Sequence, residues 1–526
     1  MLSRTKIVFT KNGEWVKQLF GILAFLLFAF PASATTYYIS YSAGSNTNNG
    51  TSEQTPWKSH PYMQNAAGCA GAPPSYSHSM GDRFIFKQGD SWPNACFVMT
   101  IQAGGASGNP DVYTFDPAWG AAGGMTGNTG QRVGAYQFTA GGSAIHGDDR
   151  YNHFIVVKAS YLTLDGIEFT GMTWTGSGGP YGNELGIYLG TSTNVIVSDC
   201  YFHGWTHPGA TVDALAWIVA FPGSPYGAGD RVTGNVFDGT SSGGAGISDS
   251  GAATYAIPLS DNNIVKNMSN GLLLGLNPVV YNNQIGPINR SFDETQHENC
   301  IEPIVMPNGL NSNVYIYNNI WHDCYAVGLL TQGAPVSAGT EKDYIWNNVV
   351  YAGSENFPTV LVEFDSQSTN NSKSEVHAWN NTIYAGSNRD CTRAINRGHG
   401  NFGVLELINN HCISGSGFIT LEITGNAYAN TTNLLMKIST AASQGYALSE
   451  MYAYSPTTGK RSTVGAGTNL TKLISGNTAT LATDTTYAGM RLPISRPSGG
   501  PWDIGAYQYG GSPTAAPPTH LSMAIQ

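Results

Sequence analysis

Residues 316–350 decide the fold, because one short motif occurs twice within them. The two copies read Ile316-Tyr-Asn-Asn-Ile-Trp321 and Ile345-Trp-Asn-Asn-Val-Val350. Each copy has an apolar run, a pair of asparagines and a second apolar run. Short apolar runs rich in β-branched and aromatic residues are typical of strands. Because Asn adopts the left-handed backbone conformation more readily than most residues, the pair predicts a sharp corner between two strands.

The motif recurs from about residue 160 to residue 413. The other copies are Val195-Ile-Val-Ser-Asp-Cys-Tyr-Phe202, Val232-Thr-Gly-Asn-Val-Phe237, Leu259-Ser-Asp-Asn-Asn-Ile264, Val280-Tyr-Asn-Asn-Gln-Ile285, Ala378-Trp-Asn-Asn-Thr-Ile383 and Leu407-Ile-Asn-Asn-His-Cys412. Their alignment predicts one column of corner residues: Cys200, Asn235, Asn262, Asn283, Asn319, Asn348, Asn381 and Asn410. The spacings are 35, 27, 21, 36, 29, 33 and 29 residues.

A fixed motif at irregular spacing predicts stacked coils with loops of variable length. A β-propeller would instead need a regular blade period of about 40–50 residues. Stacked asparagines can also hydrogen-bond along the stack. We therefore expect an all-β chain, folded as a single-stranded parallel β-helix with terminal caps; its right-handed sense is implied by the resemblance described below.

Composition and charge favour a β-rich extracellular protein. Charged residues make up 11% of the 526 residues, about half of the roughly 25% that is usual. Gly is abundant, at 65 residues. The formal net charge of -10 argues against a nucleic-acid partner, since binding to phosphates needs a basic surface.

The first 34 residues have the pattern of a secretory signal peptide. Lys6, Lys11 and Lys17 precede an apolar run over residues 19–30, and Ala32-Ser-Ala34 offers a cleavage site. We therefore expect secretion, to the periplasm or outside the cell, and no membrane anchor after cleavage. The predicted boundaries are 35–159 for an N-terminal cap and first coils, 160–423 for the repeats, 424–509 for C-terminal coils or a cap, and 510–526 for a disordered tail.

The chain has seven cysteines, all after the predicted cleavage site. An odd number leaves at least one of them free. Cys69 and Cys96 lie in a loop-rich region, and we expect them to form a disulfide. The other five fall in strand-like runs, where buried thiols are expected. No spacing of His and Cys indicates a zinc site.

Beyond the repeat, three segments resemble known proteins. They are Tyr37-Tyr-Ile-Ser40 with the turn-rich residues 45–57, Gly81-Asp-Arg-Phe-Ile-Phe-Lys-Gln-Gly-Asp-Ser-Trp92, and Asp503-Ile-Gly-Ala-Tyr507. Over residues 36–509 the chain is similar to the pectin-lyase-like right-handed parallel β-helix proteins. The resemblance implies three strands per coil and, in an enzyme, a cleft over the first strands. It does not select an activity, because the superfamily includes lyases, hydrolases, epimerases, adhesins and tailspikes.

Two carboxylates are the first catalytic candidates. We expect Glu302, Gly328 and Glu363 to share one outward column of the first sheet. Two rungs would separate the carboxylates by about 9–10 Å, close to the roughly 6.5–9.5 Å of inverting glycosidases. Gly328 would leave room for a sugar between them. The alternative is that both Glu residues only solvate the sheet.

The polar loop before Glu302 is a second candidate. Asp293 and His297 could act as an acid/base pair, or could join Glu298 in a calcium site of oxygen ligands. The alternative is a solvated loop with a capping Asp.

Cations gather in a third segment, at Arg389, Arg393, Arg397 and His399. Arg pairs well with carboxylates, so a polysaccharide that contains uronic acids is a candidate partner. A lyase could use His399 or an Arg as its base. Gly398-His-Gly400 is similar to one polygalacturonase motif, but the other motifs of that family are missing, so none of its residue roles is carried over.

Aromatic residues precede the corner asparagines. One outward column is predicted to hold Tyr281, Tyr317, Trp346 and Trp379, and the next Tyr315, Tyr344 and His377. Exposed aromatic rings suit the flat faces of sugars. Alternatively, a loop or the C-terminal cap covers them, or they form a subunit interface.

Three functions remain open from the sequence. The first is an enzyme that cleaves a polysaccharide, as a glycoside hydrolase or a polysaccharide lyase. The second is a non-catalytic protein that binds a polysaccharide at the cell surface. The third is a structural extracellular homo-oligomer.

Overall fold

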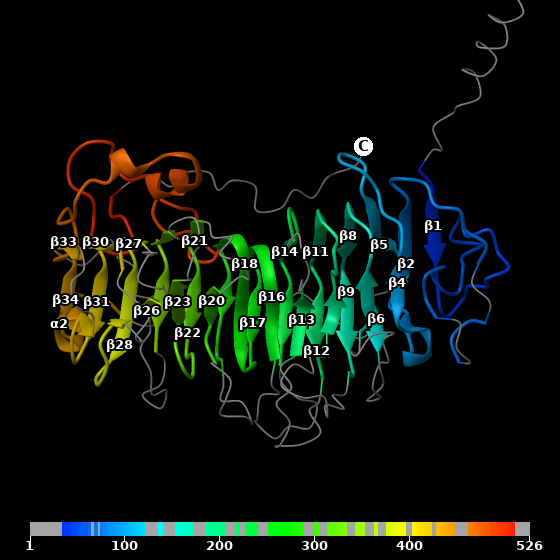
Figure 1. The fold of residues 1–526 in the computed structure, drawn as a ribbon, viewed down its shortest axis with the longest axis horizontal. Helices are drawn as coiled ribbons and strands as arrows, with labels where there is room; N and C mark the ends of the chain where they lie inside the picture. The colour runs from blue at the N-terminus through cyan, green and yellow to red at the C-terminus, as the bar shows by residue number, and fades with distance from the viewer. Residues whose placement is uncertain are drawn as a thin grey trace, which may run out of the picture.

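The computed structural model describes residues 34–64, 68–71, 74–120, 135–139, 153–172, 185–205, 216–220, 227–239, 251–288, 298–303, 313–333, 342–352, 362–366, 375–395, 402–422, 428–447 and 461–510. They form a right-handed parallel β-helix whose coils follow one another along its long axis (Figure 1). The predicted all-β parallel β-helix is confirmed, whereas the terminal caps stay a prediction. The predicted signal peptide (except Ala34) and C-terminal tail (except Gly510) lie outside the described residues.

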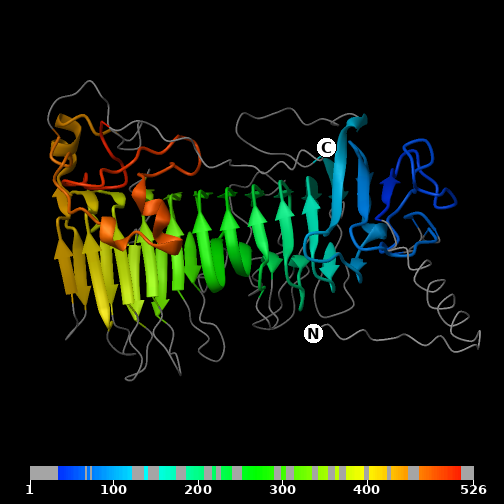
Figure 2. The same cartoon turned by 90° about the horizontal axis from the view of Figure 1, so that it is seen from above.

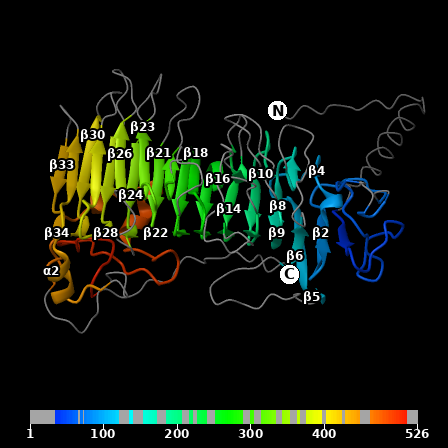
Figure 3. The ribbon, with the colours of Figure 1, turned by 90° about the horizontal axis from the view of Figure 1, so that it is seen from below.

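Three parallel ladders build the helix, one from each strand of a coil. The first contains β4 (Met99–Ile101), β7 (Ile155–Val157), β10 (Leu185–Tyr188), β13 (Ala216–Ala220), the starts of β16 (Gly251–Asp261) and β18 (Asn270–Tyr281), β20 (Ile301–Pro303), β23 (Leu329–Gly333), β26 (Val362–Ser366), β29 (Thr392–Ile395) and β32 (Ile419–Glu422). Figure 3 shows β10, β16, β18, β23 and β26 in this order along the axis.

The second ladder ends at the asparagine corner and begins near the N-terminus of the described chain. It contains β1 (Thr36–Ile39), β2 (Arg83–Gln88), β5 (Asp111–Gly120), β8 (Leu162–Asp165), β11 (Val195–Ser198), β14 (Arg231–Thr233), the ends of β16 and β18, β21 (Asn313–Tyr317), β24 (Lys342–Trp346), β27 (Glu375–Trp379), β30 (Val404–Ile408) and β33 (Tyr428–Thr431).

The third ladder follows the corner. It contains β3 (Ser91–Trp92), β6 (Tyr136–Thr139), β9 (Ile167–Thr170), β12 (Tyr201–His203), β15 (Val236–Asp238), β17 (Ile264–Lys266), β19 (Gln284–Ile285), β22 (Ile320–His322), β25 (Val349–Tyr351), β28 (Thr382–Gly386), β31 (His411–Ser414) and β34 (Leu434–Met436). Helical turns are short: η1 (Asn94–Cys96), α2 (Ile438–Ser443), η4 (Thr471–Leu473) and η5 (Gly476–Ala482).

The core fills the inside of the coils, because alternate residues of every strand point inward. On the third ladder, Phe169, Phe202 and Phe237 stack in line, with ring centroids 4.8 Å apart at each step. The same packing of Phe side chains is thus repeated from coil to coil. The core is therefore a continuous column along the axis.

The two residues of each asparagine pair have different roles. The first residue takes the left-handed backbone conformation, as at Asn318 with φ of 58° and Asn347 with φ of 57°. The second residue is buried and joins a ladder of side-chain hydrogen bonds. At the pair 262–263 the left-handed residue is Asn262 and the ladder residue is Asn263. The prediction that Asn262 belongs to the column was therefore wrong by one residue.

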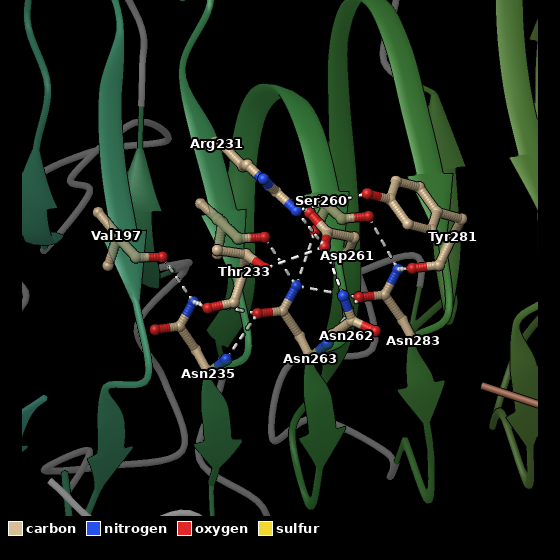
Figure 4. A network of polar contacts seen from close by, with 11 residues as sticks. Val197, Arg231, Thr233, Asn235, Ser260, Asp261, Asn262, Asn263, Tyr281 and Asn283 are labelled. Atoms are coloured by element: carbon tan, nitrogen blue, oxygen red, sulfur yellow. Dashed lines mark hydrogen bonds and ion pairs between the residues drawn. The ribbon is translucent and has the colours of Figure 1, made fainter. Parts of the chain in front are cut away.

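The ladder repeats the same bonds at every step. Both the backbone N–H and the Nδ2 of Asn319 donate to Oδ1 of Asn348, at 3.0 and 3.2 Å, and Nδ2 also donates to the carbonyl oxygen of Val280. This contact confirms the prediction that Asn319 and Asn348 occupy equivalent corners. Figure 4 shows the same pattern at Asn235, Asn263 and Asn283, and the ladder ends at Asn433. Each unpaired buried group would cost about 1–3 kcal/mol, so the ladder fixes the register of the coils.

Three disulfides link six of the seven cysteines. Cys69–Cys96 was predicted and is confirmed. Two further bonds, Cys300–Cys324 and Cys391–Cys412, show that the prediction of buried thiols was wrong for these four residues. Cys200 is the free, buried cysteine. In each new pair the second residue lies just after a strand or within one of the third ladder, a proximity that sequence separation does not reveal.

The C-terminal residues 461–510 lie along the side of the helix (Figures 1 and 2). They contact the corner through the left-handed asparagines: Asn347 Nδ2 donates to the carbonyl of Thr483, and Asn380 Nδ2 donates to that of Asp503. Within residues 424–509, predicted as C-terminal coils or a cap, β33 and β34 thus add a coil, and residues from 461 onward cover a lateral face. Within the described part of the chain, no helix is both long and apolar enough to cross a membrane.

Candidate functional site

Glu302 and Glu363 share one outward column of the first ladder, as predicted. Strand β23 lies between β20, which carries Glu302, and β26, which carries Glu363. Ile301 pairs with Leu329, so Glu302 is opposite Leu330, and Leu330 pairs in turn with Glu363. The middle rung therefore carries Leu330, and the prediction of Gly328 there was wrong. The cause is a two-residue difference in the start of the strand, which the variable loop before it hides. Leu330 does not leave the open space that a glycine would.

Both carboxylates are almost fully buried although they point away from the core. Glu302 is 4% exposed and Glu363 is 2% exposed. Their spacing is two rungs, or about 10 Å between backbones. Burial of a charged group is costly unless it has partners. Two such groups in one column are therefore the strongest sign of a site on this ladder.

Glu302 is oriented by Asn299, which the sequence analysis did not single out. Asn299 Nδ2 donates to Oε2 of Glu302 at 2.8 Å. The rest of Asn299 is held in place as well: its backbone N–H donates to Oδ1 of Asn270, and its Oδ1 accepts from the N–H of Val327. Asn270 and Asn299 thus begin a second asparagine row, which an alignment of this corner could have found.

Glu363 lies beside a cation. Arg393, on the next rung, places Nη1 3.6 Å from Oε2 of Glu363. Arg393 is therefore brought to the carboxylates as part of the same column, and its side chain is about one-third exposed. Its positive charge faces a carboxylate of the protein itself, which weakens its role as a binding group for uronic acids.

Two further charged candidates are described: Glu298 is 5% exposed, and Arg389 lies between β28 and β29. Asp293, His297, Arg397 and His399 lie outside the described residues. Among the residues that are described, no group of three or more His, Cys, Asp or Glu side chains is arranged to hold a metal ion.

The aromatic columns have the predicted register, and their rings stack along the axis. Tyr281, Tyr317, Trp346 and Trp379 follow one another on the second ladder. Neighbouring rings stack on each other: Tyr317 and Trp346 have centroids 4.5 Å apart and planes 12° apart. Tyr281 and Tyr317 stack in the same way, so in these two pairs the facing sides of the rings are covered by each other. Rings stacked along the axis offer their edges more than their faces, and the role of this column as a sugar platform stays a prediction.

The C-terminal segment covers much of the same column. Trp346 and Trp379 are 0% and 3% exposed, and both pack with Leu470, Leu481 and Trp502 of that segment. The alternative that a cap covers the aromatic residues is the one found for these two. As carbohydrate contacts, Trp346 and Trp379 would require the segment to leave, and Tyr317 borders the same cluster.

The next outward column carries charged groups that the sequence analysis missed. Tyr315, Tyr344 and His377 lie in register with Glu406, and Glu375 precedes His377 by two residues on β27. Alternation along β27 and β30 was the available signal for Glu375 and Glu406. These side chains stay partly exposed at the border of the C-terminal segment.

Comparisons with known proteins identify no family. No family model matches the chain, and no curated protein matches it. Among solved structures, the chain is similar to a GH136 lacto-N-biosidase from Eubacterium ramulus, at 11% identity over 81% of this chain and 69% of the other, with a TM-score of 0.35.

Two further structures show a similar likeness. A rhamnogalacturonan lyase is 14% identical over 73% of this chain and 75% of its own, with a TM-score of 0.31. A mutant tailspike protein of E. coli bacteriophage HK620, in complex with a pentasaccharide, is 14% identical over 68% of this chain and 60% of its own, with a TM-score of 0.40. At this level of similarity the comparisons do not assign an activity to this chain.

Proposed function

We propose that this protein is a secreted carbohydrate-active protein that binds a polysaccharide along the first ladder and cleaves it by hydrolysis. The observation that carries the proposal is the pair of nearly buried carboxylates, Glu302 and Glu363, two rungs apart in one outward column. Three disulfides agree with an oxidising, extracellular compartment.

The spacing favours inversion of the anomeric centre. A retaining glycosidase needs its carboxyl groups about 5–5.5 Å apart, whereas two rungs suit the longer separation that admits a water molecule. Arg393 supplies positive charge beside Glu363, which suits the carboxylate that acts as base. Glu302, whose described partner is the amide of Asn299, then acts as the acid.

Elimination is the less favoured chemistry. A lyase must neutralise the uronate of its substrate, and Arg393 already faces Glu363 at 3.6 Å. Binding without cleavage is the second candidate function, and it is favoured by Leu330, which stands between the two carboxylates.

The test is an assay of the purified protein on neutral and uronic polysaccharides. Hydrolysis predicts new reducing ends without the ultraviolet absorbance of an unsaturated product. Glu302→Gln and Glu363→Gln should each lower turnover by about 10²–10⁴-fold. As a matched control, Glu53→Gln, at a partly exposed residue in the N-terminal turns, should leave turnover unchanged.

Three outcomes would contradict parts of the proposal. Unsaturated products would replace hydrolysis by elimination. Full activity in both Gln variants would move the chemistry away from this column. Tight binding without any product would establish the binding-only function.

A further inference from the structure

The outward face of strands β21, β24, β27 and β30 presents a second polar cluster, separate from the first-ladder carboxylates. Its members are Tyr315, Lys342, Tyr344, Glu375, His377 and Glu406. The side chains of Glu375, His377 and Glu406 are 15–26% exposed, so solvent reaches all three.

Both carboxylates are fixed through a single oxygen. Oε2 of Glu406 accepts from Nδ1 of His377 and from Nε1 of Trp379, each at 2.9 Å. Oε2 of Glu375 lies 2.9 Å from Nζ of Lys342 and 3.3 Å from Nε2 of His377. Within the described residues, Oε1 of each carboxylate makes no hydrogen bond to the protein. Two oriented acceptors thus remain open on this face.

Two tyrosines, Tyr315 and Tyr344, place phenol groups beside these acceptors. Tyr315 and Tyr344 stack at 5.3 Å, and Tyr344 stacks on the His377 ring at 5.0 Å. Because the ring faces are covered by one another, the rings offer their edges, and among the described residues the phenol oxygens of Tyr315 and Tyr344 make no hydrogen bond to the protein. A phenol both donates and accepts, so these tyrosines complement hydroxyl groups.

We propose that this face is a second saccharide-binding site, which takes uncharged, hydroxyl-rich sugar units of a polysaccharide. Sugar hydroxyls donate to the open oxygens of Glu375 and Glu406, and the phenols of Tyr315 and Tyr344 hydrogen-bond to neighbouring hydroxyls. Two carboxylates beside one lysine disfavour a uronate, as does the formal net charge of -10 of the whole chain.

The protonation behaviour of the carboxylates suits binding rather than cleavage. The hydrogen bond from His377 lowers the pKa of Glu406. Burial raises the pKa of Glu375, but the hydrogen bonds from Lys342 and His377 outweigh this and lower it overall. A glycosidase acid needs a raised pKa to keep its proton near neutral pH. Both groups therefore remain acceptors.

The experiment measures binding by calorimetry in the Glu302→Gln/Glu363→Gln background, so that no cleavage interferes. The probes are a soluble β-glucan, a galactomannan and polygalacturonate. A further Glu375→Gln/Glu406→Gln change keeps an oxygen for the internal donors and places an NH₂ group at each open position. Affinity for at least one neutral polymer should fall about 10-fold or more, whereas affinity for polygalacturonate should stay level or rise.

Tyr344→Phe keeps the ring stack and removes one phenol, so it should weaken neutral binding by roughly 3–10-fold. Glu53→Gln serves as the control and should change nothing. The proposal is overturned if no neutral polymer binds, if neutral binding survives the Glu375/Glu406 change and Tyr344→Phe, or if both kinds of polymer lose affinity alike. Failure of hydrolysis at Glu302 and Glu363 would leave this site unaffected.

Discussion

At the scale of single residues, the asparagine pair shows how one residue type meets two different demands. Asn347 takes the left-handed conformation and reaches outward, where its Oδ1 accepts from Nη2 of Arg496 at 2.8 Å. Asn348 is buried, and its Nδ2 donates to the carbonyl of Ile316. The backbone therefore turns at the first residue, and the hydrogen-bonding groups exposed by the turn are satisfied by the second.

Buried histidines make the stability depend on pH. Burial lowers the pKa of His411 to about 3, below its ordinary value near 6.5. The unfolded chain therefore binds more protons than the folded one between these values, so stability is lost as pH falls below about 6.5. At pH 5 this one group should cost about 2 kcal/mol relative to pH 8.

His411→Leu should remove that share of the pH dependence. Melting temperatures of the variant and the parent protein, measured from pH 8 to pH 5, should diverge at the acid end, with the shallower slope in the variant. Parallel slopes would show that His411 is protonated without cost in the fold. His322, partly exposed on the third ladder, offers the control His322→Leu.

At the scale of elements, the C-terminal segment is a structural cover for the second ladder and its corner. It places Trp502, which is 0% exposed, in one cluster with Trp346 and Trp379, and the guanidinium of Arg496 lies 5.2 Å from the Trp502 ring. Without this segment, large apolar side chains of the helix would face water. Its contacts with the left-handed asparagines fix its place along the axis.

Trp502→Ala should therefore loosen the segment. A buried Trp→Ala change typically costs about 3–5 kcal/mol, whereas Leu492→Ala, at a residue that is 50% exposed, should cost less than about 0.5 kcal/mol. Limited proteolysis should cut residues 461–510 faster in the Trp502 variant only, with a rise in the binding of a hydrophobic dye. Equal cleavage rates in both variants would contradict the assigned packing.

The structural features that were predicted correctly belong to the repeated motif, and the wrong predictions concern parts of the chain that do not repeat. The Asn-Asn corners and the aromatic register depend on a local motif, and the three-strand coil was implied by the family resemblance; all three are confirmed. Gly328 was misplaced because loops of variable length precede each first-ladder strand, so the register there is set by pairing and not by spacing. The position of residues 461–510 was left open between a cap on the last coil and a cover over the aromatic residues, because it depends on contacts with residues more than a hundred positions away, such as Asn347 with Thr483.

The residues of the candidate site also fall into those that were predicted from the sequence and those that were missed. The shared column of Glu302 and Glu363 was predicted from strand alternation, whereas Asn299 and the pair Glu375–Glu406 were missed. Asn299 lies at the corner before a first-ladder strand, where the asparagine row consists of Asn270 and Asn299 and is much shorter than the row at the Asn-Asn corner. Glu375 and Glu406 become partners only through His377, which contacts one on its own strand and one on the next.

At the scale of the whole molecule, the disulfides tie loops to the stacked coils. Cys300–Cys324 and Cys391–Cys412 close loops of 24 and 21 residues, which in the chain-entropy account is worth about 3 kcal/mol each. Each bond joins a residue at the start of a first-ladder strand to one in or after a third-ladder strand. Each of the two bonds thus holds the start and the end of one coil together.

Thiol labelling tests this assignment across the chain. Burial raises the pKa of the Cys200 thiol, and the residue is 0% exposed, so it should resist alkylation in the native protein. Labelling with iodoacetamide should give no modified cysteine in the native state, one in denaturant without reductant, at Cys200, and seven after denaturation and reduction. Peptide mass spectrometry identifies the positions. Alkylation of Cys324 or Cys412 without reductant would mean that these residues are thiols, as the strand-like sequence around them first indicated, and the estimated gain of about 3 kcal/mol per loop would be lost with them.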